Sequence, residues 1–160
     1  MENSLVYGLG RYPEVWDYHL KPLHTINAGI PGDNIQSVLW RSENLYLPNS
    51  VHTVVLLVGT NNMEADKPED IANGVISSAA KLRGRHPQLH VIITGILPRD
   101  LNLSPLREKI RLTNVLLKSL CEKTPYATTF VEQSGSWTND SGNLNKMMYF
   151  KDFIHLVEPG

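Results

Sequence analysis

Apolar, β-branched residues recur in short uninterrupted runs along the chain. Four such runs lie at residues 23–27, 53–58, 89–94 and 128–131. Continuous apolarity, without a polar residue at every second position, is typical of β-strands that are covered on both faces. The pattern therefore predicts four strands within a buried sheet.

Helical patterns fill the intervals between these runs. Asp66 and Glu69 have the spacing of a capping box, which predicts a helix from Asp66 to Gly84. Ser104 followed by Pro105 predicts the start of another helix, and a shorter one is predicted over residues 34–45. The residues expected on the buried faces of these helices are Ile35, Val38, Leu39, Ile71, Val75, Ala79, Leu82, Leu106, Ile110, Leu117 and Leu120.

The alternation of strand and helix predicts parallel strands joined by right-handed crossovers, in an α/β sandwich of three layers. A length of 160 residues fits one domain, residues 1–160, and no repeat or linker divides it. Loops rich in glycine and asparagine follow two of the predicted strands, at residues 27–34 and 59–62. Open α/β sheets place their functional sites at such loops, so we expect the chemistry there.

Charge and apolar run length exclude two classes of partner. Lysine and arginine total 15 against 16 aspartate and glutamate residues, and the basic residues are scattered, so no nucleic-acid partner is predicted. No apolar run has the length of a membrane span, and the N-terminus lacks the layout of a signal peptide. Together with a single cysteine, these features predict a cytoplasmic protein.

No cofactor site is predicted. Cys121 lies in an apolar helical pattern, which favours a packed thiol over a nucleophile, and the six histidines show no metal-ligand spacing with it. The phosphate-binding patterns G-x-G-x-x-G and G-x-x-x-x-G-K-[ST] are absent, as is the G-x-S-x-G nucleophile elbow. We therefore expect neither a metal nor an organic cofactor.

Three short stretches could support chemistry, and each has a structural alternative. Asp152 and His155 are three apart, so the carboxylate could hold one ring nitrogen while the other faces a reacting group, although a surface aspartate beside a half-buried histidine gives the same spacing. In "GTNN" an asparagine amide could bind an oxygen, or the residues could form an ordinary turn. The glycines of "NAGIPGDN" are equally ambiguous between tight turning and presentation of an N–H group.

Four features follow one another along the chain: a serine near the start, a glycine-rich loop, Gly-x-Asn and Asp-x-x-His. This ordered set resembles the SGNH, or GDSL-type, esterase family. The segments that support this resemblance are "SLV", "NAGIPGDN", "VLWR", "VVLLVGTNN", "GILPR", "SPLREK" and "DFIHL". The chain is most similar to the catalytic subunits of intracellular platelet-activating-factor acetylhydrolase. It is also similar to esterase domains of some vertebrate retroelements.

The resemblance implies the SGNH hydrolase fold, a flavodoxin-like parallel sheet between two helix layers. It implies a serine esterase that hydrolyses short, acetyl-like acyl esters, acts in lipid metabolism and needs no cofactor. The family's nucleophile corresponds to Ser4, and its acid and base correspond to Asp152 and His155. A small-molecule ester is the expected partner, and a homodimer is left open.

The resemblance also implies an oxyanion hole. Its donors are the backbone N–H groups of Ser4 and Gly32 and the side-chain amide of Asn61. Gly29 is the less favoured match for the glycine. As an ester carbonyl becomes tetrahedral, its oxygen gains negative charge that such preplaced donors stabilise.

The chain departs from the family pattern at its first block and at both ends. Glu2 and Asn3 stand where the family has glycine and aspartate. The family places a buried strand before the serine and a helix after the histidine loop, so we expect a domain truncated at both ends, without the first strand and the last helix. The alternative function is a catalytically inactive remnant or interaction module, in one version part of a retroelement protein. Arg41 and Glu43 are expected on a solvated helix face.

Overall fold

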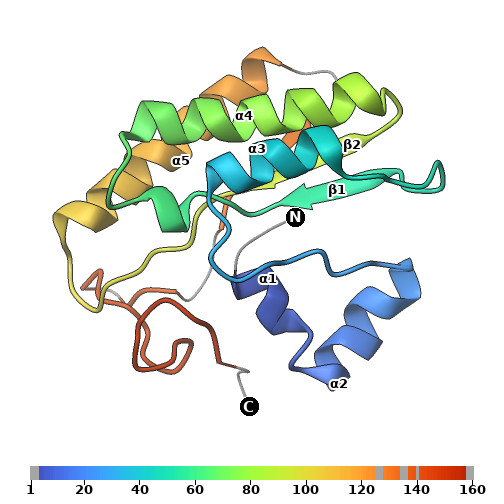
Figure 1. Ribbon diagram of the computed structural model, residues 1–160. Helices are drawn as coiled ribbons and strands as arrows, with labels where there is room; N and C mark the ends of the chain where they lie inside the picture. Colours follow the sequence, from blue (N-terminus) through green and yellow to red (C-terminus); the bar gives the residue numbers. More distant parts are fainter. Residues whose placement is uncertain (1–3, 125–127, 134–136, 140, 158–160) are drawn as a thin grey trace.

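The computed structural model describes residues 4–124, 128–133, 137–139 and 141–157, so Glu2 and Asn3 lie outside the described residues (Figure 1). Its main helices are α1 (Ser4–Leu9), α2 (Pro13–Val15), α3 (Ile35–Asn44), α4 (Pro68–Arg85) and α5 (Pro105–Lys123). Three short helical segments are η1 (Trp16–Leu20), η2 (Lys21–Leu23) and η3 (Thr60–Asn62). The strands are β1 (Thr53–Leu56), β2 (His90–Thr94) and β3 (Thr128–Val131).

The three strands form a parallel sheet in the order β1-β2-β3. In its register, Val54 lies opposite Val91, and Val91 lies opposite Thr128. Parallel pairing follows from the crossover helices, since α4 connects β1 to β2 and α5 connects β2 to β3. The predicted α/β fold with a parallel sheet is confirmed, and so are three of the four predicted strands.

The predicted strand at residues 23–27 is wrong. Leu23 ends the η2 segment, and His24 adopts a left-handed backbone conformation with φ 52°, which is incompatible with an extended strand. Leu23 and Ile26 are 72% and 75% exposed. Two apolar residues in five cannot form a strand that is buried on both faces, and hydrogen bonding in a sheet needs a neighbouring strand that local sequence does not specify.

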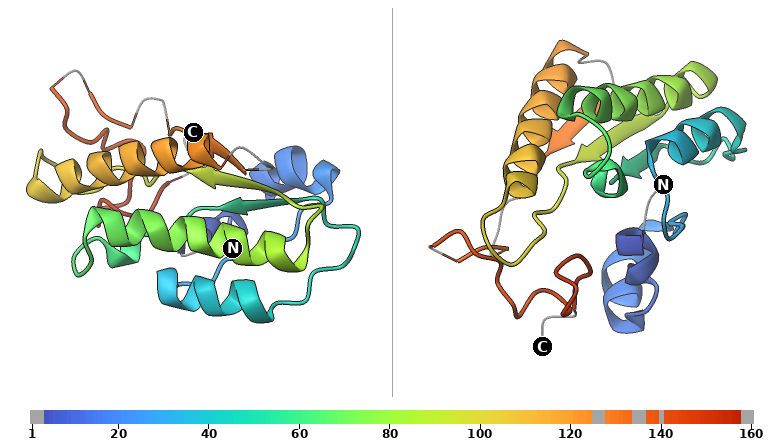
Figure 2. Two further views of the ribbon diagram at one scale, coloured as in Figure 1. Left: turned by 90° about the horizontal axis from the view of Figure 1, so that it is seen from above. Right: turned by 60° about the vertical axis from the view of Figure 1, so that its left-hand side comes forward.

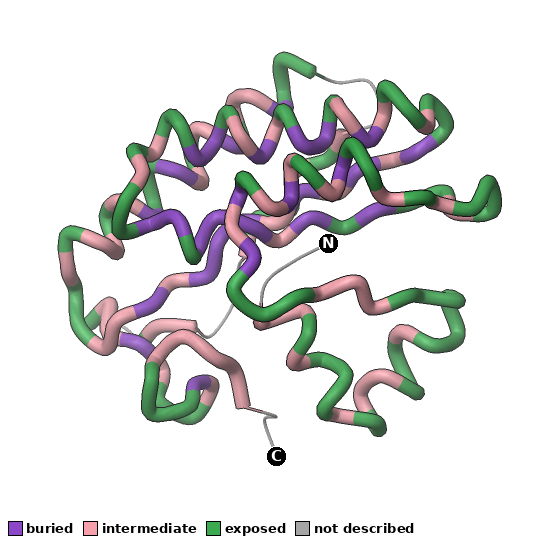
Figure 3. Tube along the Cα trace, in the orientation of Figure 1, coloured by how far each residue is buried: buried purple, intermediate pink, exposed green. Residues whose placement is uncertain are grey.

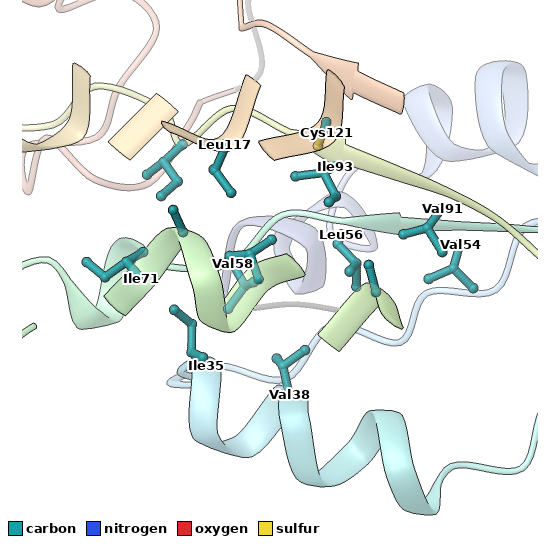
Figure 4. Packing of buried hydrophobic residues seen from close by; sticks show 14 of the residues in the cluster. Ile35, Val38, Val54, Leu56, Val58, Ile71, Val91, Ile93, Leu117 and Cys121 are labelled. Atoms are coloured by element: carbon teal, nitrogen blue, oxygen red, sulfur yellow. The ribbon is translucent and has the colours of Figure 1, made fainter. Parts of the chain in front are cut away.

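Helices α3, α4 and α5 lie side by side over one face of the sheet (Figures 1 and 2). The side chains of the core lie between this helix layer and the strands, as the close view in Figure 4 shows. The largest fully buried side chains are Val38, Leu56, Met63, Ile71, Val75, Leu82, Leu89, Val91, Ile93, Ile96 and Leu117. Most of the predicted apolar helix positions are therefore confirmed as core.

The opposite face of the sheet is more exposed. Burial alternates along β1, where Val54 is buried and Val55 is 47% exposed, and Val131 of β3 is 44% exposed. The expectation that the strands are covered on both faces is therefore wrong for this outer face. Burial is also low at the start of the chain, because no residue from 4 to 32 is buried (Figure 3).

Two of the three predicted helix starts are confirmed by their caps. The Asn34 side chain accepts a hydrogen bond from the Ser37 backbone nitrogen at 2.9 Å, and Ser104 Oγ accepts one from Arg107 at 3.2 Å. The predicted cap at Asp66 is wrong, because its carboxylate accepts a hydrogen bond from the Asn62 side chain and α4 begins at Pro68. No helix in the described parts of the chain is long and apolar enough to cross a membrane.

Candidate active site

Three of the predicted site residues form a hydrogen-bonded series. Ser4 is the first residue of α1, whereas Asp152 and His155 lie in a loop near the other end of the chain. Ser4 Oγ lies 2.6 Å from His155 Nε2, and His155 Nδ1 lies 2.7 Å from Asp152 Oδ2. The fold therefore brings a hydroxyl, an imidazole and a carboxylate together in line across 151 positions of sequence.

The loop from Asp152 to His155 is shaped by its own hydrogen bonds. Asp152 Oδ1 accepts from the backbone nitrogens of Ile154 and His155, both at 3.0 Å, which leaves Oδ2 for the imidazole. Phe153 takes a left-handed conformation with φ 54°. Because a bulky side chain rarely adopts this conformation, the loop holds the aspartate and histidine together at a cost in backbone strain.

The electrostatics of this loop favour an ionised Asp152. Burial disfavours the charged form, but hydrogen bonds from the His155 side chain and from the backbone nitrogens of His155 and Ile154, together with the His155 charge, outweigh it and hold the pKa of Asp152 below its usual value. An ionised carboxylate can only accept a hydrogen bond, so in the neutral form of the ring the proton lies on Nδ1, beside Asp152. His155 Nε2 then presents a lone pair to the Ser4 hydroxyl.

The two oxyanion candidates outside α1 lie in loops that are joined directly. Asn61 Nδ2 donates to the backbone oxygen of Asp33 at 2.7 Å, one residue after Gly32. Gly32 has φ 82°, and no heavy atom lies within 4 Å of the position that a Cβ atom would occupy there. Asn61 is exposed. Both residues are therefore accessible, and the amide of Asn61 is oriented by the loop that contains Gly32.

Gly29, unlike Gly32, packs closely against another part of the backbone. A Cβ atom on Gly29 would lie 2.9 Å from Tyr7 Cα and 3.0 Å from the Val6 carbonyl carbon, so the missing side chain permits contact with the backbone of α1. Asn27 fastens the same contact, because its Nδ2 donates to the Val6 oxygen at 2.8 Å and its Oδ1 accepts from the Gly29 nitrogen at 2.9 Å. This loop therefore positions the helix that begins with Ser4.

Arg41 was predicted on a solvated helix face, and this prediction is wrong. Its side chain is 13% exposed and forms an ion pair with Asp33, whose side chain is 8% exposed. Arg41 Nη2 also donates to the Ala28 oxygen at 2.6 Å. Arg41 of α3 thus binds both ends of the glycine loop, which comprises residues 27–34. The one available sequence signal was that Arg41 follows the apolar position Val38 by three residues, which places it at the edge of the buried face.

Asn62 was also missed by the sequence analysis. It is 4% exposed, its Oδ1 accepts from the Ile35 nitrogen at 2.9 Å, and its Nδ2 donates to Asp66 and Gln36. This asparagine fastens the turn after β1 to the first residue of α3. The two asparagines of "GTNN" thus differ, since Asn62 is buried and structural whereas Asn61 faces solvent.

Two cavities lie near these elements. One of about 320 Å³ is lined by Tyr7, Gly10, Arg11, Asn27 and Gly29, beside the contact between α1 and the glycine loop. A larger one of about 440 Å³ is lined mainly by α5 together with Glu132, Gln133, Trp137 and Thr138, and neither lining includes Ser4 or His155. In the described parts of the chain, no group of three or more His, Cys, Asp or Glu side chains could hold a metal ion.

Comparison with known families gives a match over almost the whole chain. A sequence model described as the GDSL-like lipase/acylhydrolase family matches residues 3–160. Human platelet-activating factor acetylhydrolase IB subunit alpha2 is 35% identical over 159 residues, which are 99% of this chain and 68% of that protein. The human alpha1 subunit is 34% identical over 148 residues, which are 92% of this chain and 63% of that protein. The chain thus spans about two thirds of the length of these relatives.

Solved structures agree on the fold. A GDSL-like lipase from Bacteroides thetaiotaomicron superposes with a TM-score of 0.80 at 20% identity, over 99% of this chain and 78% of that chain. An aryl esterase from M. smegmatis superposes with a TM-score of 0.58 at 16% identity, over 82% of this chain and 69% of that chain. At these identities the superpositions bear on the architecture alone.

Proposed function

Because the chain belongs to the GDSL-like lipase/acylhydrolase family and is thus a carboxylic ester hydrolase, we propose that it hydrolyses short acyl esters with Ser4 as nucleophile. The observation that supports this proposal most directly is the hydrogen-bonded series from Ser4 through His155 to Asp152. A serine hydroxyl is a weak nucleophile until an adjacent base takes its proton, and the series supplies that base at 2.6 Å.

In the proposed reaction, His155 Nε2 removes the Ser4 proton as Oγ attacks the ester carbonyl carbon. Asp152 fixes the tautomer of the ring and stabilises the imidazolium that forms. The tetrahedral intermediate collapses to an acyl-serine, and His155 gives its proton to the departing alcohol. A water molecule, deprotonated by the same ring, then releases the carboxylic acid and restores Ser4.

The oxyanion donors in this proposal are the N–H groups of Ser4 and Gly32 and the amide of Asn61. The positive φ of Gly32 and its exposure support its role, because no heavy atom from elsewhere in the chain lies within 4 Å of its Cβ position. The bond from Asn61 to Asp33 supports the role of the amide, because one N–H is used for orientation and the second is left for the substrate. Each donor is expected to contribute about a hundredfold or more in rate.

The substrate class rests on the relatives. The two human proteins are named as subunits of an acetylhydrolase of platelet-activating factor, so an acetyl ester is the proposed substrate of this chain. The cytoplasmic location and the homodimer considered from the sequence remain predictions.

Hydrolysis of p-nitrophenyl acetate tests the proposal. The wild-type chain is expected to turn over this ester, and both Ser4→Ala and His155→Ala are expected to lower kcat by about a thousandfold or more. Equal rates for all three proteins would refute the proposal. A fluorophosphonate probe that labels Ser4 in the wild type, but not in Ser4→Ala, would exclude the alternative of a catalytically inactive remnant or interaction module.

A further inference from the structure

The side chain of Arg99 contacts the turn that contains Asn61 at two points, one before and one after that residue. Arg99 lies in the loop after β2, and its side chain is 9% exposed. Its Nη1 donates to the Thr60 backbone oxygen at 3.1 Å, and its Nη2 lies 2.6 Å from Glu64 Oε1. Thr60 precedes Asn61 directly, and Glu64 follows it by three residues.

The burial of this guanidinium is not explained by the ion pair alone. The side chain of Glu64 is 80% exposed, so an arginine at the surface could pair with it without being desolvated. Burying a cation costs free energy, and an ion pair with an exposed carboxylate stabilises the fold too little to offset that cost. What burial adds here is the bond to the Thr60 carbonyl, which is a buried contact.

The other side of the turn is fixed as well. The Asn62 side chain accepts a hydrogen bond from the Ile35 nitrogen at the start of α3 and donates one to Asp66, so the residue after Asn61 is held in place. Asn61 therefore lies between two anchored neighbours, and its exposed side chain reaches across to Asp33. A side chain on a doubly anchored turn loses little entropy when it binds a developing charge.

We propose that Arg99 is a positioning residue for the oxyanion amide, acting through the Thr60–Asn61 peptide and without contact to the substrate. This inference rests on the proposed function, because it assigns the purpose of Arg99 to the oxyanion role of Asn61.

A double-mutant cycle with p-nitrophenyl acetate tests the inference. Arg99→Met is expected to lower kcat by about tenfold or more with KM changed by less than about twofold. In an Asn61→Ala background, the same substitution is expected to lower kcat by less than about twofold, because the residue through which Arg99 acts is gone. Arg99→Lys should restore part of kcat, since an ammonium can still reach one of the two oxygens.

Arg107→Met is the matched control. Arg107 also donates to two backbone oxygens, of Asp100 and Gly142, but neither flanks an oxyanion candidate. It should alter the unfolding midpoint without a comparable fall in kcat. Equal kcat losses in Arg99→Met and Arg107→Met, or equal losses from Arg99→Met in the presence and absence of Asn61, would overturn the inference.

Glu64→Ala provides a variant that keeps the fold if Arg99→Met does not, because the Glu64 side chain is mostly exposed. It removes one of the two contacts of the guanidinium, so kcat should fall about threefold in the wild type and remain unchanged in Asn61→Ala. No fall in the wild type would overturn the inference. Failure of the proposed function is distinguishable, because Ser4→Ala would then retain the wild-type rate.

Discussion

Gly29 packs against α1 so closely that a Cβ atom on it would lie 2.9 Å from Tyr7 Cα. The atoms in the way belong to backbone and cannot rotate aside. We expect Gly29→Ala to lower the free energy of unfolding by about 1–3 kcal/mol, as overpacking does elsewhere. Because the displaced helix begins with Ser4, kcat should fall as well. Urea unfolding and p-nitrophenyl acetate kinetics measure the two effects.

Gly8→Ala is the control for this prediction. Gly8 also lies in α1, but no heavy atom lies within 4 Å of its Cβ position. Alanine is the better helix former, so the substitution should raise the free energy of unfolding by about 0.5 kcal/mol and leave kcat unchanged. A loss of stability equal to that of Gly29→Ala would contradict the steric explanation.

The ion pair between Arg41 and Asp33 predicts a large loss of stability on truncation. Arg41→Met would leave the Asp33 carboxylate, 8% exposed, without its cation. Removing one partner of a buried pair costs about 3 kcal/mol, because the other charge stays desolvated. The same substitution releases the Ala28 oxygen, so the loop with Gly32 should loosen and kcat should fall. Chemical denaturation with parallel rate measurements is the appropriate test.

Arg111→Met is the control for this prediction, because it removes an arginine from an exposed ion pair. Arg111 pairs with Glu108 through two hydrogen bonds, but both side chains are more than half exposed. The unfolding curve should therefore hardly move, since exposed pairs are screened by solvent. Comparable shifts of the curve for Arg41→Met and Arg111→Met would show that burial is not the cause.

Asp152 predicts both an activity loss and a dependence of stability on pH. Asp152→Asn should lower kcat by about a thousandfold, because the amide no longer fixes the required tautomer of His155. The pKa of Asp152 is lower in the folded chain than its usual value of 3.8. The wild type therefore gains stability from this group above its unfolded-state pKa, and loses it as the pH falls through the folded-state pKa. Urea unfolding of the wild type and Asp152→Asn between pH 7 and about pH 3 should show the difference between them shrinking in acid.

Cys121 is expected to be unreactive in the folded chain. It is buried in α5, and burial, assisted by the charge of Glu122, raises the pKa of its thiol to about 11. A thiol reagent such as Ellman's reagent should therefore react slowly at pH 8 and quickly after urea is added. Rapid reaction of the folded chain would contradict the packing of α5 against the sheet.

Local patterns predicted those elements whose determinants are local. The apolar runs that became β1, β2 and β3 each keep several β-branched residues together, and the caps at Asn34 and Ser104 need a partner only three residues away. The run at residues 23–27 failed because a strand also needs a neighbouring strand, which is a property of the whole sheet. The cap at Asp66 failed because Asn62 takes its carboxylate.

The site shows the same division. A family pattern assigned roles to Ser4, Gly32, Asn61, Asp152 and His155, which stay predictions, and the structure joins Ser4, His155 and Asp152 in hydrogen bonds. Arg41 and Arg99 stand in two segments of that pattern, "VLWR" and "GILPR", but the pattern gave neither of them a role, and their contacts with the loops of the site are visible only in the structure. Arginines that bind distant backbone oxygens leave no periodic trace, because the partner is determined by where two loops meet.

The left-handed conformation of Phe153 restricts which descendants of this sequence could keep the histidine loop. At most loop positions the size or polarity of a side chain decides whether it is tolerated, whereas at position 153 the ability to adopt a positive φ decides it. Glycine and asparagine enter the left-handed region easily, and valine and isoleucine hardly at all. Drift at position 153 should therefore run toward small or amide residues, however closely a branched side chain matches phenylalanine in hydrophobicity.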